Sequence, residues 1–284
     1  MTAAQESPAD VAPSPCARIG ESVVSADPGS TPAVVRASIA ELAERARSLA
    51  GPGRRRVLGI TGAPGAGKST LARQLVEALG PQTAALVPMD GFHLSNAVLR
   101  ALARHDRKGA WDTFDADGYV HLMQRLRSRA EPVVYAPDFD RGIEESIGSA
   151  LPVPREIPLI ITEGNYLLSD EGSWPGAAAL LDETWYLAID DGLRHQRLVA
   201  RHEAHGKTHD LAVVWTHGSD ETNAEVVARS RSRADLVVTV QSAAQAEREA
   251  QGSTAAAITA PVVQRPGAAG GSPRRPGGTA FQDP

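Results

Sequence analysis

The residues with the clearest chemical meaning lie in the stretch GITGAPGAGKST, which runs from Gly59 to Thr70. Within it, Gly62 to Ser69 fit the pattern G-x-x-x-x-G-K-[ST], between an apolar run and an amphipathic segment. Glycine permits backbone conformations in which successive N–H groups turn inward around phosphate oxygens at the start of a helix. We therefore predict that the phosphates of a nucleotide bind at this loop, which has nine consecutive residues: Gly62, Ala63, Pro64, Gly65, Ala66, Gly67, Lys68, Ser69 and Thr70.

Three side chains at the end of this loop supply a charge and two hydroxyls. Lys68 is expected to reach the β- and γ-phosphates, where a unit charge pair about 4 Å apart gains roughly 4 kcal/mol at an effective dielectric of about 20. Ser69 is expected to offer its hydroxyl to Mg²⁺, and Thr70 to assist at the α-phosphate. The motif alone leaves the fate of the phosphate open, because switch GTPases, motors and small-molecule kinases share it. The sequence lacks the N-K-x-D segment that usually accompanies guanine specificity, which disfavours a switch GTPase.

Two acids follow apolar runs at positions where a parallel sheet would present them to a ligand. Asp90 ends ALVPMD and Glu163 ends LIITE, and each is followed by a glycine. In open parallel sheets, ligands bind beyond the carboxyl ends of the strands. Asp90 is our candidate for the general base that takes a proton from an attacking hydroxyl, and Glu163 could hold Mg²⁺ directly or through a water. The alternatives are a helix cap for Asp90 and a buried lysine partner for Glu163.

The elements that must position these residues alternate between short apolar runs and helical patterns, as in a parallel sheet with crossover helices. Predicted strands cover residues 56–61, 84–89, 158–162, 185–189 and 236–240. Predicted helices cover residues 35–50, 68–79, 95–105, 116–129, 193–205 and 221–233. Long connections are expected at 107–115 and 131–154. The fold class is therefore α/β: a P-loop NTPase with three α/β/α layers and a mostly parallel sheet of about five strands.

Composition limits the partners and the surroundings. The formal charge of −5 gives no basic footprint for nucleic acid. No apolar run approaches the 18 or so residues of a membrane span, and no secretory signal opens the chain. Cys16 is the only cysteine, which indicates a reducing compartment; we expect a cytoplasmic protein. Residues 1–33 and 241–284 are rich in Pro, Ala, Gly and Ser, so we expect a disordered leader and a disordered tail around a single kinase domain at 34–240.

Several segments resemble one family in their order along the chain. GITGAPGAGKSTLA, MDGFHL, RKGAWDTFDADGY, VYAPDFDR, IITEGNYLL and RLVARHEAHGK are similar to the corresponding segments of P-loop kinases of the uridine kinase, phosphoribulokinase and bacterial pantothenate kinase family. The resemblance covers about residues 35–240. DGFH and RKG…FD resemble the pantothenate kinase side, and especially its relatives named nucleoside/nucleotide kinase family proteins, some of which are linked to fructose uptake.

The resemblance implies an ATP- and Mg²⁺-dependent kinase with a small hydroxylated acceptor, and suggests a homodimer by analogy. It implies ATP at Gly62 to Thr70, a catalytic base at Asp90 and a metal- or substrate-linked acid at Glu163. Arg197 and Arg201 match arginines of the family's lid, and their four-residue spacing puts both on one helix face, where they could neutralise transferring phosphate or form a solvated basic face. The acceptor contacts that it implies, besides Asp90, are His93, Arg107, Lys108, Tyr135 and Arg141.

Some features depart from the family pattern or leave alternatives. The lid reads RHEAHGK, with fewer arginines than uridine kinases tend to have, and GFH replaces the aromatic residue that follows their base, which puts uridine in doubt. The acceptor could be a nucleoside, pantothenate or a sugar, and a nucleoside monophosphate kinase stays open. A rival of another class is a nucleotide-gated regulatory or binding protein without an acceptor. His202, His205 and His209 have helical metal-ligand spacing, but no nearby cysteine completes a zinc set.

Overall fold

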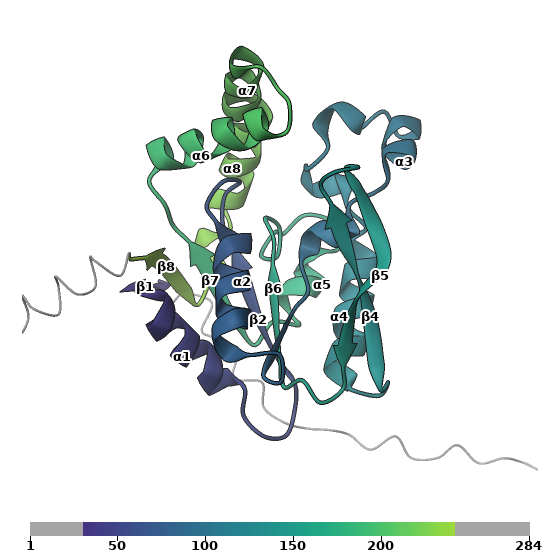
Figure 1. Ribbon diagram of the computed structural model, residues 1–284, viewed down its shortest axis with the longest axis vertical. Helices are drawn as coiled ribbons and strands as arrows, with labels where there is room; N and C mark the ends of the chain where they lie inside the picture. The colour runs from purple at the N-terminus through teal and green to yellow at the C-terminus, as the bar shows by residue number, and fades with distance from the viewer. Residues whose placement is uncertain (1–30, 242–284) are drawn as a thin grey trace, which may run out of the picture.

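The computed structural model describes residues 31–241, and their centre is a six-stranded parallel sheet (Figure 1). Its strand order is β1-β8-β7-β2-β6-β3, and every neighbouring pair is parallel. The strands are β1 (Ala33–Ala37), β2 (Arg56–Thr61), β3 (Ala84–Leu86), β6 (Leu159–Glu163), β7 (Glu183–Leu187) and β8 (Leu236–Val240). β2, which leads into the phosphate loop, lies between β7 and β6, so its carboxyl end is at the centre of the sheet.

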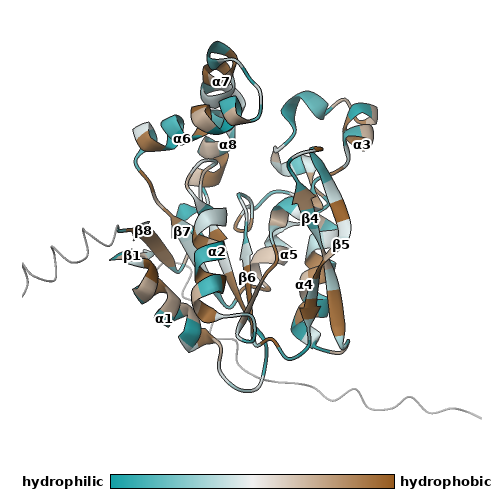
Figure 2. Ribbon diagram, viewed as in Figure 1, coloured by the Kyte–Doolittle hydropathy of each residue, from teal (hydrophilic) through white to brown (hydrophobic). Residues whose placement is uncertain are grey.

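Helices cover both faces of this sheet, because side chains along each strand alternate between two buried cores. On one face, α1 (Ile39–Leu49) and α2 (Lys68–Leu79) pack Leu42 and Leu75 against Leu58 and Trp185. On the other face lie α4 (Ala116–Ser128), α5 (Trp174–Ala178) and α8 (Glu221–Ala228). The predicted three-layer P-loop α/β/α fold is confirmed. Figure 2 shows hydrophobic residues along the central strands and more hydrophilic ones in the segments above the carboxyl edge.

Two groups of elements rise above the carboxyl edge of the sheet (Figure 1). The first, which we call the lid, consists of α6 (Asp191–Ala204), α7 (His209–Trp215) and a π-helical turn, Thr216–Asp220, that leads into α8. The second comprises α3 (Asn96–Ala101), three 3-10 turns and the upper end of an antiparallel hairpin. Those turns are Met89–Phe92, His105–Arg107 and Trp111–Thr113; a fourth, Arg231–Arg233, precedes β8.

Most predicted elements lie where the sequence patterns placed them. β2, β8 and α2 have the predicted bounds, and β6, α4 and α6 begin or end within two residues of theirs. The predicted helix at 35–50 is wrong at its start, because residues 33–37 form β1, a sixth strand beside β8. Ser38 then caps α1, receiving the N–H of Glu41 while the Glu41 carboxylate receives the N–H of Ser38.

The connection predicted as a loop at 131–154 is a two-stranded antiparallel sheet. β4 (Val133–Asp140) pairs with β5 (Glu145–Pro154), with a register shift between Ala136 and Asp138. Val134 and Ala136 are buried against the core, whereas in β5 four consecutive residues, 147–150, are exposed, so β5 lacks the alternation that marks a strand. α7 was also missed. The expected leader and tail lie outside the described residues, except where β1 begins at Ala33.

Arg55, one residue before β2, links the hairpin to the sheet through hydrogen bonds. Its side chain is 1% exposed and donates to the carbonyl oxygens of Ile157, Leu126 and Pro154 at 2.8, 2.9 and 2.5 Å. Burial lowers its pKa to about 10, so the guanidinium stays charged at neutral pH. These charge-assisted bonds join the end of α4 to the end of β5.

Replacing Arg55 with methionine is expected to lower the free energy of unfolding by about 3 kcal/mol, because buried carbonyl oxygens lose their donor. Urea unfolding followed by circular dichroism would measure it. The control is Arg54→Met at the neighbouring arginine, which is 60% exposed and pairs with Asp182; its effect should be below about 0.5 kcal/mol. Equal effects of the two substitutions would contradict this role for Arg55.

Candidate active site

The phosphate loop joins β2 to α2 and depends on glycines at two tight positions. Gly65 has φ +80°, and a Cβ there would lie 2.7 Å from the Leu198 side chain, so the loop packs closely against α6. Gly67 has φ +98° and stands at the N-cap of α2. Both backbone conformations are disfavoured for other residues. The loop therefore presents its N–H groups at the start of α2, as the motif predicts.

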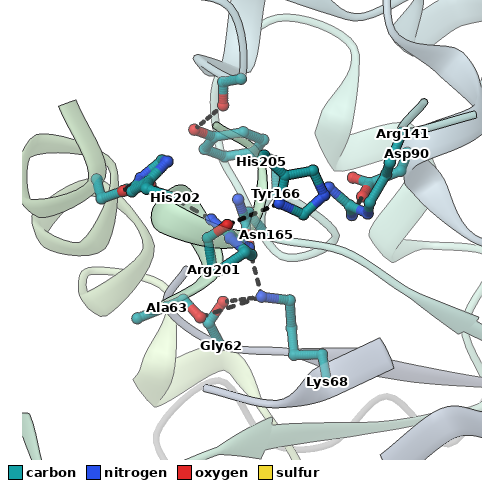
Figure 3. Close-up of polar contacts among 12 residues, drawn as sticks. Gly62, Ala63, Lys68, Asp90, Arg141, Asn165, Tyr166, Arg201, His202 and His205 are labelled. Carbon is teal, nitrogen blue, oxygen red and sulfur yellow. Dashed lines mark hydrogen bonds and ion pairs between the residues drawn. The ribbon is translucent and has the colours of Figure 1, made fainter. Parts of the chain in front are cut away.

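Lys68 is held across the mouth of this loop (Figure 3). Its ammonium donates to the main-chain oxygens of Gly62 and Ala63 at 2.9 and 3.1 Å and to Asn165 Oδ1 at 2.6 Å. Burial lowers the pKa of Lys68 to about 8, although the nearby carboxylates of Glu163 and Asp90 act in the opposite direction. A buried ammonium whose hydrogen-bond partners are neutral oxygens is well suited to receive an anion.

Glu163 lies at the carboxyl end of β6, directly beside β2. It is paired in register with Ile60, is 5% exposed, and lines the same cavity as the Ser69 side chain, which helps to lower its pKa. Burial and the charge of Asp90 raise its pKa, whereas Lys68 lowers it. The Ser69 hydroxyl and the Glu163 carboxylate are hard oxygen donors next to the phosphate loop, so this pair fits the requirements of Mg²⁺.

Asp90 occupies the 3-10 turn that follows β3. Its carboxylate receives a hydrogen bond at 2.7 Å from Nη2 of Arg141, which lies in the turn of the hairpin (Figure 3). The turn is capped by Pro88 without a side-chain hydrogen bond, so Asp90 does not act as its helix cap. β3 pairs with β6, which places the turn that carries Asp90 beside Glu163 at the same edge of the sheet. The two acids therefore lie near each other, at the carboxyl edge where the sequence pattern predicted them.

These groups line one cavity of about 640 Å³ between the phosphate loop, the hairpin and the lid. Among the described residues, seven lysine and arginine side chains line it: Lys68, Arg73, Lys108, Arg141, Arg197, Arg201 and Lys207. Four carboxylates do so: Asp90, Glu144, Glu163 and Asp220. The whole sequence contains three lysines, and all three are in this lining. The cavity therefore has an excess of positive charge.

The acceptor side of the cavity has an aromatic wall. The His93 ring lies between Phe114 and Phe139, with ring centroids 4.0 and 4.6 Å apart, and burial lowers its pKa. Lys108 and Arg141 both lie over the Phe139 ring, at 5.1 and 5.7 Å from its centroid. The imidazole is tilted by 42° against each phenyl ring, and the two cations lie beside this aromatic wall at Phe139.

Lys108 bridges the second group of elements to the turn of the hairpin. Its ammonium donates to Asn96 Oδ1 at 2.8 Å and to the main-chain oxygen of Glu144. Burial lowers its pKa. Within residues 31–241, neither Lys108 nor Lys207 forms an ion pair with a carboxylate; the Lys207 ammonium lies 4.9 Å from the centre of the Trp215 ring.

The lid places its two predicted arginines on the other side of the cavity. Arg197 Nη1 donates to Ala66 O at 3.3 Å, and Arg201 Nη2 lies 3.7 Å from Asp220 Oδ1. His202 Nε2 and Asp220 Oδ2 are 2.7 Å apart. The three lid histidines do not converge: His205 bonds to Arg201 O, and His209 to Glu203. Within residues 31–241 no group of three His, Cys, Asp or Glu side chains could hold a metal.

Two predicted acceptor residues lie outside the cavity lining. Arg107 forms a two-bond ion pair with Asp112, and Tyr135 stands on β4 with 55% of its surface exposed. The other predicted site residues either line the cavity or belong to the phosphate loop. Gly62 and Ala63 bind Lys68 through their carbonyl groups, and Ala66 faces a second cavity.

Sequence reasoning missed several lining residues: Arg73, Phe139, Asn165, Lys207 and Trp215. Asn165 follows Glu163 by two positions, so the strand-end argument could have found it. Its main-chain oxygen receives the Thr61 hydroxyl at 3.0 Å, which fixes the Asn165 amide beside Lys68. The sequence offered one indication that Lys207 belongs to the site. Lysine occurs at only three positions in a chain that is rich in arginine, and one of the other two is Lys68 of the phosphate loop.

The second cavity, of about 670 Å³, lies on the other side of the phosphate loop. Gly67, Thr70 and Arg197 line both cavities, so the loop and the first turn of α2 separate them. The rest of its lining comes from the carboxyl ends of β1, β7 and β8, from the starts of α1 and α6, and from Leu71 and Gln74 of α2. Its apolar members are Ile39, Ala66, Leu71, Leu187, Ala188, Ile189, Leu193 and Val240.

The three-layer fold and the phosphate loop define a P-loop protein, and comparison with known proteins shows which family of P-loop proteins it is. Residues 57–247 match the pattern of the phosphoribulokinase/uridine kinase family, and the chain belongs to this family. It is 33% identical over 211 residues to the "Putative uridine kinase C227.14" of Schizosaccharomyces pombe, a match that covers 70% of this chain and 88% of that protein.

Two solved structures extend the comparison. A "putative fructose transport system kinase" from Silicibacter sp. TM1040 is 38% identical, with a TM-score of 0.65 over 70% of this chain and 98% of the other. YFH7 from Saccharomyces cerevisiae, described as "a putative P-loop containing kinase with a circular permutation", has a TM-score of 0.61 at 17% identity. The match covers 72% of this chain and 99% of the other, and shows the fold alone. No helix within residues 31–241 is long and apolar enough to cross a membrane.

Proposed function

We propose that the protein transfers the γ-phosphoryl group of ATP, with Mg²⁺, to a hydroxyl group of a small metabolite. The observation that carries this proposal is the presence of the Asp90 carboxylate in the same cavity as Lys68 and the Ser69–Glu163 pair. A phosphate loop alone would suit a regulatory protein. A carboxylate opposite it, with room between for another molecule, suits transfer to an acceptor.

Each group has a separate role in this proposal. Asp90 takes the proton of the acceptor hydroxyl as its oxygen forms a bond to the γ-phosphorus and the bond to ADP breaks. Arg141 holds the Asp90 carboxylate at the cavity wall. Lys68, Arg197 and Arg201 neutralise charge on the phosphoryl oxygens. Ser69 and Glu163 would hold Mg²⁺, which when bound shields the negative charge of the phosphates.

The charges of the cavity also support a class of acceptor. The lining has three more cationic side chains than carboxylates. The magnesium complex of ATP is a dianion, so it would leave part of this excess positive charge unneutralised. Lys108 is half-buried and has only neutral oxygens as hydrogen-bond partners. We propose that the acceptor carries an anionic group, a carboxylate or a phosphate. This differs from uridine, the neutral substrate that the name of the Schizosaccharomyces pombe relative suggests.

A coupled assay of ADP release would test both proposals with acceptors in matched pairs. The pairs are D-glycerate and glycerol, pantothenate and pantothenol, UMP and uridine, and fructose 6-phosphate and fructose. We expect acceptor-dependent ADP release from at least one anionic member, and kcat/KM at least about tenfold lower for its neutral partner, since a charge-assisted contact is worth about 1.5 kcal/mol or more.

The outcomes separate the hypotheses. Faster turnover of a neutral member would overturn the anionic acceptor but retain the kinase. ADP release that no acceptor changes, together with tight nucleotide binding, would favour the nucleotide-gated regulatory protein over the kinase. A direct readout of binding, such as calorimetric titration of magnesium and a nonhydrolysable ATP analogue, distinguishes that case from an inactive preparation.

A further inference from the structure

The N-terminal β1–α1 unit lies ahead of the segment that matches the family, yet it borders the phosphate loop. The match begins at residue 57, whereas Arg36 at the end of β1 and Ile39 at the start of α1 line the second cavity. β1 is fixed there by parallel pairing with β8, in which Arg36 stands opposite Thr239. The main-chain N–H of Gln241 donates to Ala37 O at 2.9 Å, which extends this pairing to the carboxyl edge.

The position of the second cavity determines which part of a nucleotide can reach it. The acids and the acceptor space lie on one side of the phosphate loop, and this cavity lies on the other. If the γ-phosphate points toward Asp90, as the proposed function requires, the nucleoside must extend to the opposite side. Apart from Arg36, the charged side chains that line this cavity are Asp190 and Arg197, and most of its other walls are apolar.

Arg36 is the unexplained group in this cavity. Its side chain is exposed, and within residues 31–241 its guanidinium forms no hydrogen bond or ion pair. A planar cation beside apolar walls is a good partner for a flat aromatic base, because it can stack on the ring and its donors can reach ring nitrogens or ribose oxygens. The neighbouring arginines Arg45 and Arg47 of α1 differ from Arg36, because they pair with the carboxylates of Glu183 and Glu44.

We propose that Arg36, next to Ile39, binds the nucleoside half of ATP, so that the β1–α1 unit forms part of the nucleotide site. This inference rests on the proposed function for the direction of the nucleotide. It assigns a binding role to a strand that the sequence pattern had placed in a helix. It also gives β1 and α1 a place in the wall of this cavity, beside β8 at the edge of the sheet.

The test compares Arg36→Ala with the full-length wild type in calorimetric titrations with magnesium and two ligands. The ligands are AMPPNP, which has a nucleoside, and tripolyphosphate, which has none. We expect Arg36→Ala to weaken AMPPNP binding by about tenfold, because the contact between a cation and an aromatic ring is lost, and to leave tripolyphosphate binding unchanged. Arg36→Lys keeps the charge without the plane and should have an intermediate effect.

The matched control is Val34→Ala, on the same face of β1 but two residues farther from the loop and outside the cavity lining; it should change neither affinity. Unchanged AMPPNP binding in Arg36→Ala would overturn the inference. An equal loss for both ligands would also overturn it, because Arg36 would then act on the phosphates or on folding. Failure of the kinase proposal would appear elsewhere, as wild-type nucleotide binding without transfer to any acceptor.

Discussion

Replacing Asp90 with asparagine should leave the affinity for ATP and Mg²⁺ unchanged and lower phosphoryl transfer by at least about 100-fold. The reason is that an amide cannot accept the hydroxyl proton, and a positioned general base contributes about 10² to 10⁴ in rate. Asparagine preserves the size of the side chain and an oxygen that can still accept the hydrogen bond from Arg141. The loss should therefore fall on kcat, measured as ADP release with the best acceptor from the screen.

The control for this experiment is Asp170→Asn, which removes an exposed carboxylate paired with Arg233 outside the cavity. It should retain wild-type turnover. Wild-type turnover in Asp90→Asn would remove Asp90 as the base. A large loss of nucleotide affinity in that variant would instead assign Asp90 to the metal site, together with Glu163 and Ser69.

Replacing Lys68 with methionine should reduce both nucleotide affinity and transfer, with kcat/KM for ATP about 100- to 1,000-fold lower. Lys68 is the buried cation at the loop, and removal of one preorganised charge next to the reacting phosphate typically costs this much. Methionine keeps the apolar stem, so the folded core should be retained. Calorimetric titration with AMPPNP and the ADP-release assay would separate the binding loss from the rate loss.

Lys68→Arg is the informative companion, because it retains the charge. The wider, planar guanidinium would have to fit among the Gly62, Ala63 and Asn165 oxygens that now hold a compact ammonium, so recovery should be partial at most. Full activity in Lys68→Met would contradict the assignment of Lys68 to the phosphates. Full activity in Lys68→Arg would show that charge alone, without the geometry of the ammonium, is sufficient.

The sequence predicted the centre of the site well because that part depends on local patterns. The phosphate loop is a continuous motif, and Asp90 and Glu163 follow apolar runs whose carboxyl ends must share one edge of a parallel sheet. Knowing this edge was enough to expect the two acids near Lys68. No long-range geometry beyond the strand direction was needed.

The acceptor side could not be predicted in the same way, because it depends on pairing between distant or irregular segments. β5 carries exposed small and polar residues, so its pairing with β4 leaves little periodic trace. That pairing decides that Phe139 and Arg141 face the cavity while Tyr135 does not. β1 was missed for a related reason: residues 35–37 fit a helical spacing, and their pairing with β8, some 200 residues away, overrides it.

The placement of the lysines has a practical consequence for anyone who labels this protein. Since Lys68, Lys108 and Lys207 all line the same cavity, reagents that acylate or alkylate primary side-chain amines would act as site-directed inhibitors. Coupling to an ester-activated resin or dye would attach the chain through the very groups that ATP and its acceptor are proposed to need. Saturating nucleotide should then protect Lys68 from acylation. A thiol or a terminal tag would be the better site for attaching a label.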